Sequence, residues 1–174
     1  WASFYVVDEN PQALLERVMA LGGSTVVPLT EIPGIGLFAM FGDLDGNVVG
    51  IVGAGSGLLA GRPSPGDAPA VDWFEVIGSD AARTQSFYGE VFGWAMAPGF
   101  PGYRLVDTQS GESSIGGGVG GGAEQATWAT VYANVPDVEA TLARAEKLGG
   151  SRVYGPNPVD DHMKTGALRD PAGN

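Results

Sequence analysis

One phrase occurs twice in this sequence, and it constrains the fold more than any other feature. "ALGGSTV" begins at residue 20, and "KLGGSRV" begins 127 positions later. At that offset two further pairs of segments align without a gap: 1–5 with 128–132 ("WASFY" and "WATVY") and 43–47 with 170–174 ("DLDGN" and "DPAGN"). A repeat of about fifty residues is too long for a solenoid unit and is typical of a duplicated supersecondary module.

The first copy, 1–53, predicts the order β-α-β-β-β. Residues 1–7 are aromatic and β-branched, which indicates a strand. Asn10 before Pro11 predicts a helix start, and Gly22 and Gly23 predict its end, so a helix is expected near 10–21. Three further strands are expected, at 24–30, 36–42 and 47–53.

The second copy, 126–174, predicts the same order but stops before its last strand. Asp137 is the expected N-cap of a helix near 137–148, which Gly149 and Gly150 end. In the first copy the last strand follows "DLDGN", whereas the second copy ends at Asn174. We therefore expect that this strand is disordered or that the chain was cut there.

A third segment, 71–120, follows a stretch rich in Gly, Pro and Ala at 54–70, which reads as a linker. "VDWFEVI" predicts a strand, and Ser79 or Asp80 is the expected cap of a helix that Gly93 ends. Further strands are expected near 94–98, in "YRLVDT" and in "SSIGGGV". This segment is again β-α-β-β in order, but its sequence differs from the other two.

The combination of "SFYGEVFGW" at 86–94 with "LGGS" and "DPAGN" downstream resembles the vicinal oxygen chelate superfamily. This group contains glyoxalases, bleomycin-resistance proteins and extradiol dioxygenases, and the arrangement is similar to tandem-domain glyoxalase-like proteins of actinobacterial type. The resemblance implies an α+β fold, in which repeated βαβββ modules pair into curved mixed sheets around a cleft. It implies that 71–174 is one domain, built from 71–120 and 126–174.

The resemblance also implies that 1–53 is the C-terminal-type module of a preceding domain, whose partner module is absent from the chain. A βαβββ module exposes an apolar sheet face that another module must cover. We therefore expect a segment upstream of Trp1, or a second chain, to pair with 1–53. The start in mid-strand, without a Met, favours the upstream segment.

In metal-dependent members of this superfamily, His, Glu, Gln or Tyr side chains on the first and last strands hold a divalent ion. At the corresponding positions this sequence has Trp73, Thr130 and Gly50. A divalent ion needs three or more oxygen or nitrogen ligands. No metal or other cofactor is therefore expected, and a divalent metal is the alternative if a one-residue register error has hidden its ligands.

Two pairs of residues are expected to share strand faces: Trp73 with Glu75, and Trp128 with Thr130. If these faces line the cleft, its aromatic walls suit a flat apolar or cationic molecule. Glu75 would then be a carboxylate in a half-apolar pocket and the candidate general base. The alternatives are an ordinary core for the Trp residues, and for Glu75 a solvent-facing or Arg-paired position.

His162, the one histidine of the sequence, follows Asp160 and Asp161 in a polar turn, where it is either a ligand-binding residue or a surface residue. "GGGVGG" at 116–121 formally satisfies G-x-G-x-x-G. It lacks the helix and the downstream acidic residue of a dinucleotide site, so we predict a bent strand and a hinge instead.

Composition excludes several classes of function. A net charge of −11 disfavours nucleic-acid partners, and the absence of Cys excludes disulfides and thiolate chemistry and fits a cytoplasmic location. No apolar run approaches eighteen residues, so a membrane span is not expected.

The leading hypothesis is a metal-free glyoxalase-like protein that binds a small organic molecule, either to sequester it, as bleomycin-resistance proteins do, or to sense it. The alternative is an enzyme, a metal-dependent lyase or dioxygenase of glyoxalase or extradiol type. A third hypothesis is that the repeat serves oligomerisation only. Fold alone does not decide among them.

Overall fold

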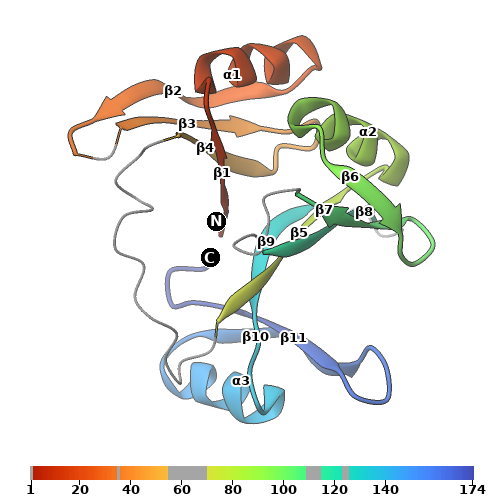
Figure 1. The fold of residues 1–174 in the computed structure, drawn as a ribbon. Coiled ribbons are helices and arrows are strands. Elements are labelled where there is room, and N and C mark those ends of the chain that lie inside the picture. The colour runs from red at the N-terminus through yellow and green to blue at the C-terminus, as the bar shows by residue number, and fades with distance from the viewer. Residues whose placement is uncertain (1, 35, 55–69, 109–114, 123–125) are drawn as a thin grey trace. The chain divides into compact units, whose positions relative to one another are not determined.

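The computed structural model describes residues 2–34, 36–54, 70–108, 115–122 and 126–174 (Figure 1). The chain divides into two compact units, a larger one, Ala2–Tyr132, and a smaller one, Ala133–Asn174. In chain order the elements are β1 (Tyr5–Asp8), α1 (Pro11–Ala20), β2 (Ser24–Ile32), β3 (Gly36–Gly42), β4 (Val48–Gly53), β5 (Val71–Gly78), α2 (Ala81–Phe92), β6 (Ala95–Pro98), β7 (Tyr103–Asp107), β8 (Gly116–Gly121), β9 (Trp128–Ala133), α3 (Val138–Lys147), β10 (Ser151–Pro158) and β11 (Lys164–Arg169). Most of the predicted linker lies outside the described residues.

The first sheet of the larger unit contains four strands in the order β1-β4-β3-β2, with β1 parallel to β4. Helix α1 packs on this sheet. It begins where predicted, because the Asn10 side chain accepts a hydrogen bond from the Ala13 amide at 3.1 Å and Pro11 follows the cap. It ends before Gly22, whose φ of +92° favours glycine. The predicted β-α-β-β-β order of 1–53 is confirmed.

The second sheet contains five strands in the order β6-β7-β8-β5-β9, with β5 parallel to β8. Of the two predicted caps of α2, Asp80 is the cap, since its carboxylate accepts from the Arg83 amide at 3.0 Å. Ser79 instead donates to Asp45 in the first sheet's β3–β4 loop, at 2.6 Å. The predicted α+β architecture with mixed sheets is confirmed.

The smaller unit repeats the helix, hairpin and loop of 1–53. Asp137 caps α3, as predicted, and β10 and β11 pair antiparallel. The loop at 170–174 has the same internal bonds as the loop at 43–47. The Asn174 amide donates to Asp170 at 3.0 Å, and the Asn47 amide donates to Asp43 at 2.9 Å. The repeat in the sequence is therefore a repeat in structure.

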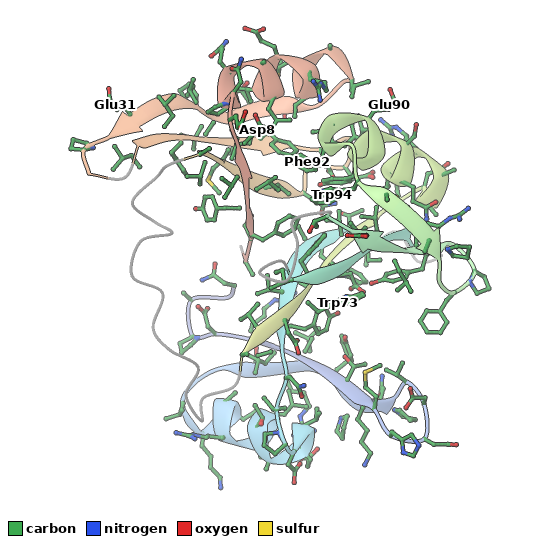
Figure 2. All side chains as sticks on the ribbon, in the orientation of Figure 1. Asp8, Glu31, Trp73, Glu90, Phe92 and Trp94 are labelled. Atoms are coloured by element: carbon green, nitrogen blue, oxygen red, sulfur yellow. The ribbon has the colours of Figure 1, made fainter. Side chains whose placement is uncertain are left out.

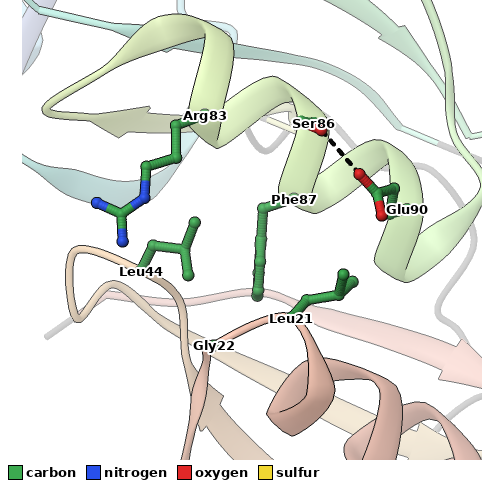
Figure 3. Close-up of a pocket in the computed structure, with 7 residues that line it drawn as sticks. All are labelled: Leu21, Gly22, Leu44, Arg83, Ser86, Phe87 and Glu90. Carbon is green, nitrogen blue, oxygen red and sulfur yellow. Dashed lines mark hydrogen bonds between the residues drawn. The ribbon is translucent and has the colours of Figure 1, made fainter.

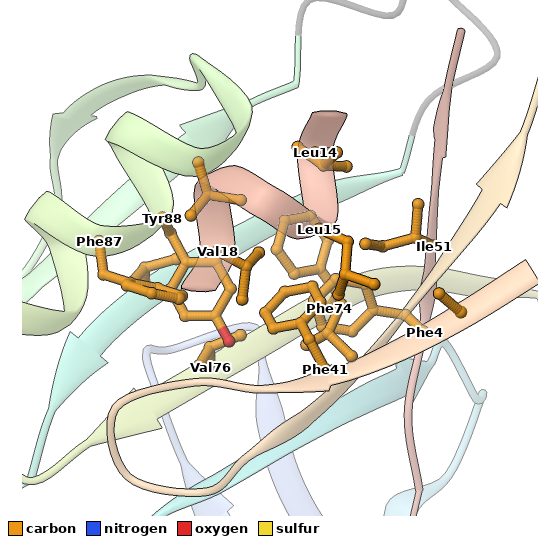
Figure 4. Close-up of a cluster of buried hydrophobic side chains, with 14 of the residues drawn as sticks. Phe4, Leu14, Leu15, Val18, Phe41, Ile51, Phe74, Val76, Phe87 and Tyr88 are labelled. Carbon is orange, nitrogen blue, oxygen red and sulfur yellow. The ribbon is translucent and has the colours of Figure 1, made fainter. Parts of the chain in front are cut away.

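One hydrophobic core joins 1–53 to 71–122 (Figure 4). The rings of Phe4 and Phe74 lie 4.7 Å apart between centroids, and those of Phe41 and Phe87 lie 6.3 Å apart. The α1 side of the first sheet is thus covered from within the chain, by β5 and α2. This contact between 1–53 and 71–120 is not among the sequence-based expectations, and the assignment of 71–174 to one domain stays a prediction.

A buried hydrogen-bond network fastens the two modules together. The Asp43 carboxylate, whose residue is 5% exposed, accepts from the Tyr88 hydroxyl at 3.1 Å and from the Asn47 amide side chain at 3.0 Å. Asn47 also donates to the carbonyl of Ile77 at the end of β5, at 3.2 Å. Burial, and then the charge of Asp43, raise the pKa of Tyr88, so its hydroxyl keeps the proton that it donates.

The opposite face of the first sheet carries Tyr5 and Val7, which are 50% and 43% exposed. Tyr5 lies against Gly50, the residue at one of the expected metal-ligand positions, and its ring is 5.8 Å from that of Phe38. Pairing with an upstream segment or a second chain stays a prediction for this face. Within the part of the chain that the structure describes, none of the helices has the length and hydropathy needed to cross a bilayer.

Candidate functional site

Strand β5 divides its side chains between two environments. Phe74 and Val76 point into the core and are 2% and 0% exposed, whereas Trp73 and Glu75 are partly buried on the other face. This alternation follows from the two-residue period of a strand. The prediction that Trp73 and Glu75 share a face is confirmed, and their face is the one directed away from the core.

Three aromatic side chains donate hydrogen bonds to the Glu75 carboxylate. The Tyr103 hydroxyl on β7 donates to Oε1 at 3.1 Å; on β9, the Trp128 indole N–H and the Tyr132 hydroxyl donate to Oε2 at 2.8 and 2.9 Å. The Trp73 indole N–H donates to the Tyr103 oxygen at 3.3 Å. We call these residues the Glu75 cluster: Trp73, Glu75, Tyr103, Trp128 and Tyr132. Figure 2 labels Trp73 on the ribbon.

Strand β8 makes room for this cluster because it has no side chain in the way. In the sheet, Gly118 pairs with Glu75 on one side and with Leu105 of β7 on the other. A Cβ atom at Gly118 would overlap the Tyr103 hydroxyl. The glycines of "GGGVGG" therefore form a strand, as predicted, and let Tyr103 reach across it to Glu75.

The surroundings of Tyr103 keep its phenol protonated. Burial raises the pKa of Tyr103 well above its ordinary range, and the nearby Glu75 carboxylate raises it further. Tyr103 is therefore a hydrogen-bond donor at neutral pH. The site thus holds an acidic side chain ringed by donors that carry no charge.

The structure brings together three of the five predicted ligand-binding residues, Trp73, Glu75 and Trp128. Thr130 lies on β9 between Trp128 and Tyr132 and is partly buried. His162 belongs to the smaller unit, where its residue is exposed and its backbone N–H donates to Asp160 at 2.7 Å. Roles for Thr130 and His162 stay predictions.

The sequence reasoning missed Tyr103 and Tyr132. The sequence pattern could have identified Tyr132, because the two-residue period that places Trp128 and Thr130 on one face of the strand also places Tyr132 there. Tyr103 had no such signal. Its part in the site depends on β7 lying one strand away from β5 and on the glycines between them.

A second candidate is an open groove between the end of α1, the β3–β4 loop and α2 (Figure 3). It is lined by Leu21, Gly22, Leu44, Arg83, Ser86, Phe87 and Glu90. Its polar lining residues are exposed, and the Ser86 hydroxyl donates to Glu90 at 2.8 Å. Specific sites need polar groups fixed in position, so the Glu75 cluster is the better candidate.

The fold consists of repeated βαβββ modules, and the first strands of two of them, β5 and β9, lie side by side in one sheet. The Glu75 cluster lies on the face of β5 directed away from the core. Together these features define a class of α+β proteins built from paired modules. A family model described as "Glyoxalase/Bleomycin resistance protein/Dioxygenase superfamily" matches residues 70–174. The chain belongs to this superfamily, as the resemblance of its motifs implied.

Two curated relatives extend the match into the first module. The "Anthracycline biosynthesis protein DnrV" of Streptomyces peucetius is 30% identical over 87% of this chain and 55% of its own length. The "Putative glyoxylase CFP32" of Mycobacterium tuberculosis is 25% identical over 99% of this chain and 66% of its own. The chain thus spans between half and two thirds of the length of these relatives.

Among solved structures, the 2,3-dioxygenase LapB from Pseudomonas sp. KL28 aligns with a TM-score of 0.55 and 18% identity, covering 99% of this chain and 68% of that one. The 2,2',3-trihydroxybiphenyl 1,2-dioxygenase from Sphingomonas wittichii strain RW1 aligns with a TM-score of 0.53, also at 18% identity, over 99% of this chain and 67% of that one. At this level of identity the likeness shows the fold alone.

The residues at the Glu75 cluster do not fit the divalent metal that many members of this superfamily use. Within the described ranges, no group of three or more His, Asp or Glu side chains is placed to hold an ion. Glu75 is the single carboxylate of the cluster, and its oxygens already accept three hydrogen bonds. Tyr is also among the ligands of this superfamily, but the phenols of Tyr103 and Tyr132 keep their protons here as donors to Glu75. A divalent ion of the expected type needs three or more such ligands.

Proposed function

We propose that this chain binds a small organic molecule at the Glu75 cluster and does so without the metal ion of its superfamily. The observation that carries the proposal is the set of bonds to Glu75. Its carboxylate is fixed by Tyr103, Trp128 and Tyr132, whose phenol and indole groups donate their protons to it and are not free to ligate a metal ion. Fixed polar groups among aromatic side chains are typical of small-molecule sites.

We propose a binding role for Glu75 in place of the predicted general base. A general base needs an oxygen that is free to take a proton from the substrate. Three donors already occupy the Glu75 oxygens, so proton transfer would first have to break one of these bonds. The metal-dependent lyase or dioxygenase is the alternative function, and metal content distinguishes it from the proposal.

An aromatic molecule is the class of ligand that we propose. Trp128 is 38% exposed, so part of its indole ring is available for stacking. The name of DnrV places that relative in anthracycline biosynthesis, and anthracyclines contain flat aromatic rings.

A cytoplasmic location is part of the same proposal and rests on the absence of Cys.

The test is titration of a set of small aromatic molecules while the Trp emission of the protein is followed. We expect binding by the wild-type chain and a loss of at least about tenfold in affinity for Trp128→Ala, because the substitution removes an aromatic wall and one donor to Glu75. Leu148→Ala is the control, since Leu148 is exposed in the smaller unit. If Trp128→Ala and the control bind equally well, the site lies elsewhere.

A further inference from the structure

The Glu75 carboxylate has hydrogen-bond donors but no cationic partner in the described part of the chain. Among the described residues, Glu75 forms no ion pair with Lys, Arg or His; Arg152 forms such pairs, with Glu139 and Glu146 in the smaller unit. The donors to Glu75 are two phenols and an indole, all of them neutral. They stabilise the charge of the carboxylate without cancelling it.

Among the described residues, three donors bond to this carboxylate, so it retains acceptor capacity for one more. An ionised carboxylate offers about four acceptor positions on its two oxygens. Two donors bond to Oε2, but Tyr103 is the one donor on Oε1. A fourth donor on Oε1 would complete the set.

Both the local and the overall charge favour a positively charged donor. A cation beside Glu75 would gain charge attraction in a partly buried place, where water screens less than in bulk. The exposed part of the Trp128 ring adds an aromatic surface that attracts cations. The net charge of −11 attracts cations to the chain and repels anions.

We propose that the molecule bound at the Glu75 cluster is an aromatic amine in its ammonium form, whose N–H group donates to Glu75 Oε1. This inference rests on the proposed function and narrows it. The neutral donors hold the carboxylate in position, and the ammonium group supplies both the missing charge and the fourth hydrogen bond. An aromatic body on the same molecule would lie against Trp128.

Three probes of similar shape test the proposal at pH 7. They are 2-phenylethylamine, which is a cation, 2-phenylethanol, which is neutral, and phenylacetate, which is an anion. Binding is measured by calorimetry and by Trp emission. We expect the amine to bind at least about tenfold more tightly than the alcohol, since a hydrogen bond between charged groups is stronger than a neutral one, and phenylacetate to bind most weakly.

Glu75→Gln should abolish the preference for the amine, because it removes the charge and keeps the shape. Glu90→Gln is the matched control, since Glu90 is exposed on α2 and bonds to Ser86. A salt titration of the wild-type chain gives a second readout that needs no variant. Amine binding should weaken as salt increases, whereas binding of the alcohol should not change.

The outcomes separate the two proposals. If the amine and the alcohol bind with equal affinity and both depend on Trp128, the cation proposal is wrong and the binding function stands. If Glu75→Gln keeps the amine preference, the charge that attracts the amine is not that of Glu75. If none of the three probes binds, both proposals fail.

Discussion

Asp43 and Asp170 occupy equivalent positions in the two copies of the repeat, but their environments differ. Each carboxylate accepts the amide of the Asn four residues later. Asp43 is buried and also accepts from the Tyr88 hydroxyl, whereas Asp170 is exposed. The side-chain amide of Asn174 also donates to Asp170, at 2.9 Å, and this bond holds the pKa of Asp170 below its ordinary value. Comparing the two residues thus separates the stability that comes from hydrogen bonds within the loop from the stability that the bonds between modules add.

Asp43→Ala should lower the free energy of unfolding of the larger unit by about 3 kcal/mol, because it leaves buried donors of Asn47 and Tyr88 without their acceptor. Urea unfolding followed by Trp emission measures this. Asp170→Ala is the matched control and should cost clearly less, because water can replace the lost acceptor in an exposed loop. Equal losses would mean that the junction bonds contribute nothing beyond the loop itself.

Tyr88 and Tyr103 make stability sensitive to alkaline pH. Burial raises the pKa of both phenols above the ordinary value of about 10, so the folded chain keeps two protons that the unfolded chain releases. Their contribution is complete below about pH 10 and is lost as the pH rises further. Tyrosinate absorbance should show at least two phenols that titrate late, and one fewer in Tyr103→Phe. Loss of all five tyrosine protons near pH 10 without unfolding would contradict the prediction.

At the scale of the element, the glycines of β8 leave space that the Glu75 cluster requires. Gly118→Ala should push the Tyr103 hydroxyl away from Glu75, because the added Cβ would occupy its place. We expect a loss of about 1–3 kcal/mol in stability and weaker binding at the cluster. Gly122→Ala is the control, since a Cβ there would come no closer than 3.6 Å to its neighbours. Thermal unfolding and probe binding measure both effects, and two variants that behave alike would contradict this account of β8.

The elements themselves could be predicted from the sequence because their signals are local. Asn10, Asp137 and Gly93 fix helix ends through bonds and backbone angles within a few residues of themselves. Because the sequence repeats, the helix and strands assigned in the first copy could also be assigned in the second. Strand order and the shared core involve residues far apart in the chain, and no local sequence pattern indicates them.

The site could be predicted only in part, for the same reason. The two-residue period placed Trp73 beside Glu75, and the structure confirms it. The contact between Tyr103 and Glu75 requires that β7 lie one strand beyond β8, and no pattern within either strand indicates that. The packing of Phe74 against Phe4 of the first module was not predicted either, because no pattern within β5 indicates which element its buried face meets.

At the scale of the whole molecule, metal content is the property that separates the two functions. We expect the purified chain to carry well below one equivalent of Zn, Ni, Mn or Fe after mild dialysis, because Glu75 is the one acidic side chain of the cluster and its two tyrosines donate to that carboxylate. Elemental analysis measures this. About one equivalent per chain, lost in Glu75→Gln but kept in Glu90→Gln, would favour the metal-dependent enzyme.

The shared core predicts that the two sheets of the larger unit unfold together. Phe74→Ala removes a ring that packs on Phe4 and Trp94, and it should cost about 4 kcal/mol. Hydrogen exchange should then speed up in β3 and β4 as well as in β5, although the substitution lies in the second sheet. Leu148→Ala should change none of these strands. Faster exchange confined to the second sheet would mean that 1–53 folds independently.

The glycine strand has a consequence for how the proposed binding surface at the Glu75 cluster can change over time. Because β8 contributes only backbone there, the chemistry of the surface depends on side chains from β5, β7 and β9. Replacements at Trp73, Tyr103 or Trp128 can alter which molecules are recognised without touching the strand that supports them. A replacement at Gly118 would disturb the surface whichever residues stand at those other positions, since it closes the space that Tyr103 crosses. A laboratory search for new ligands should therefore vary those three residues and leave β8 unchanged.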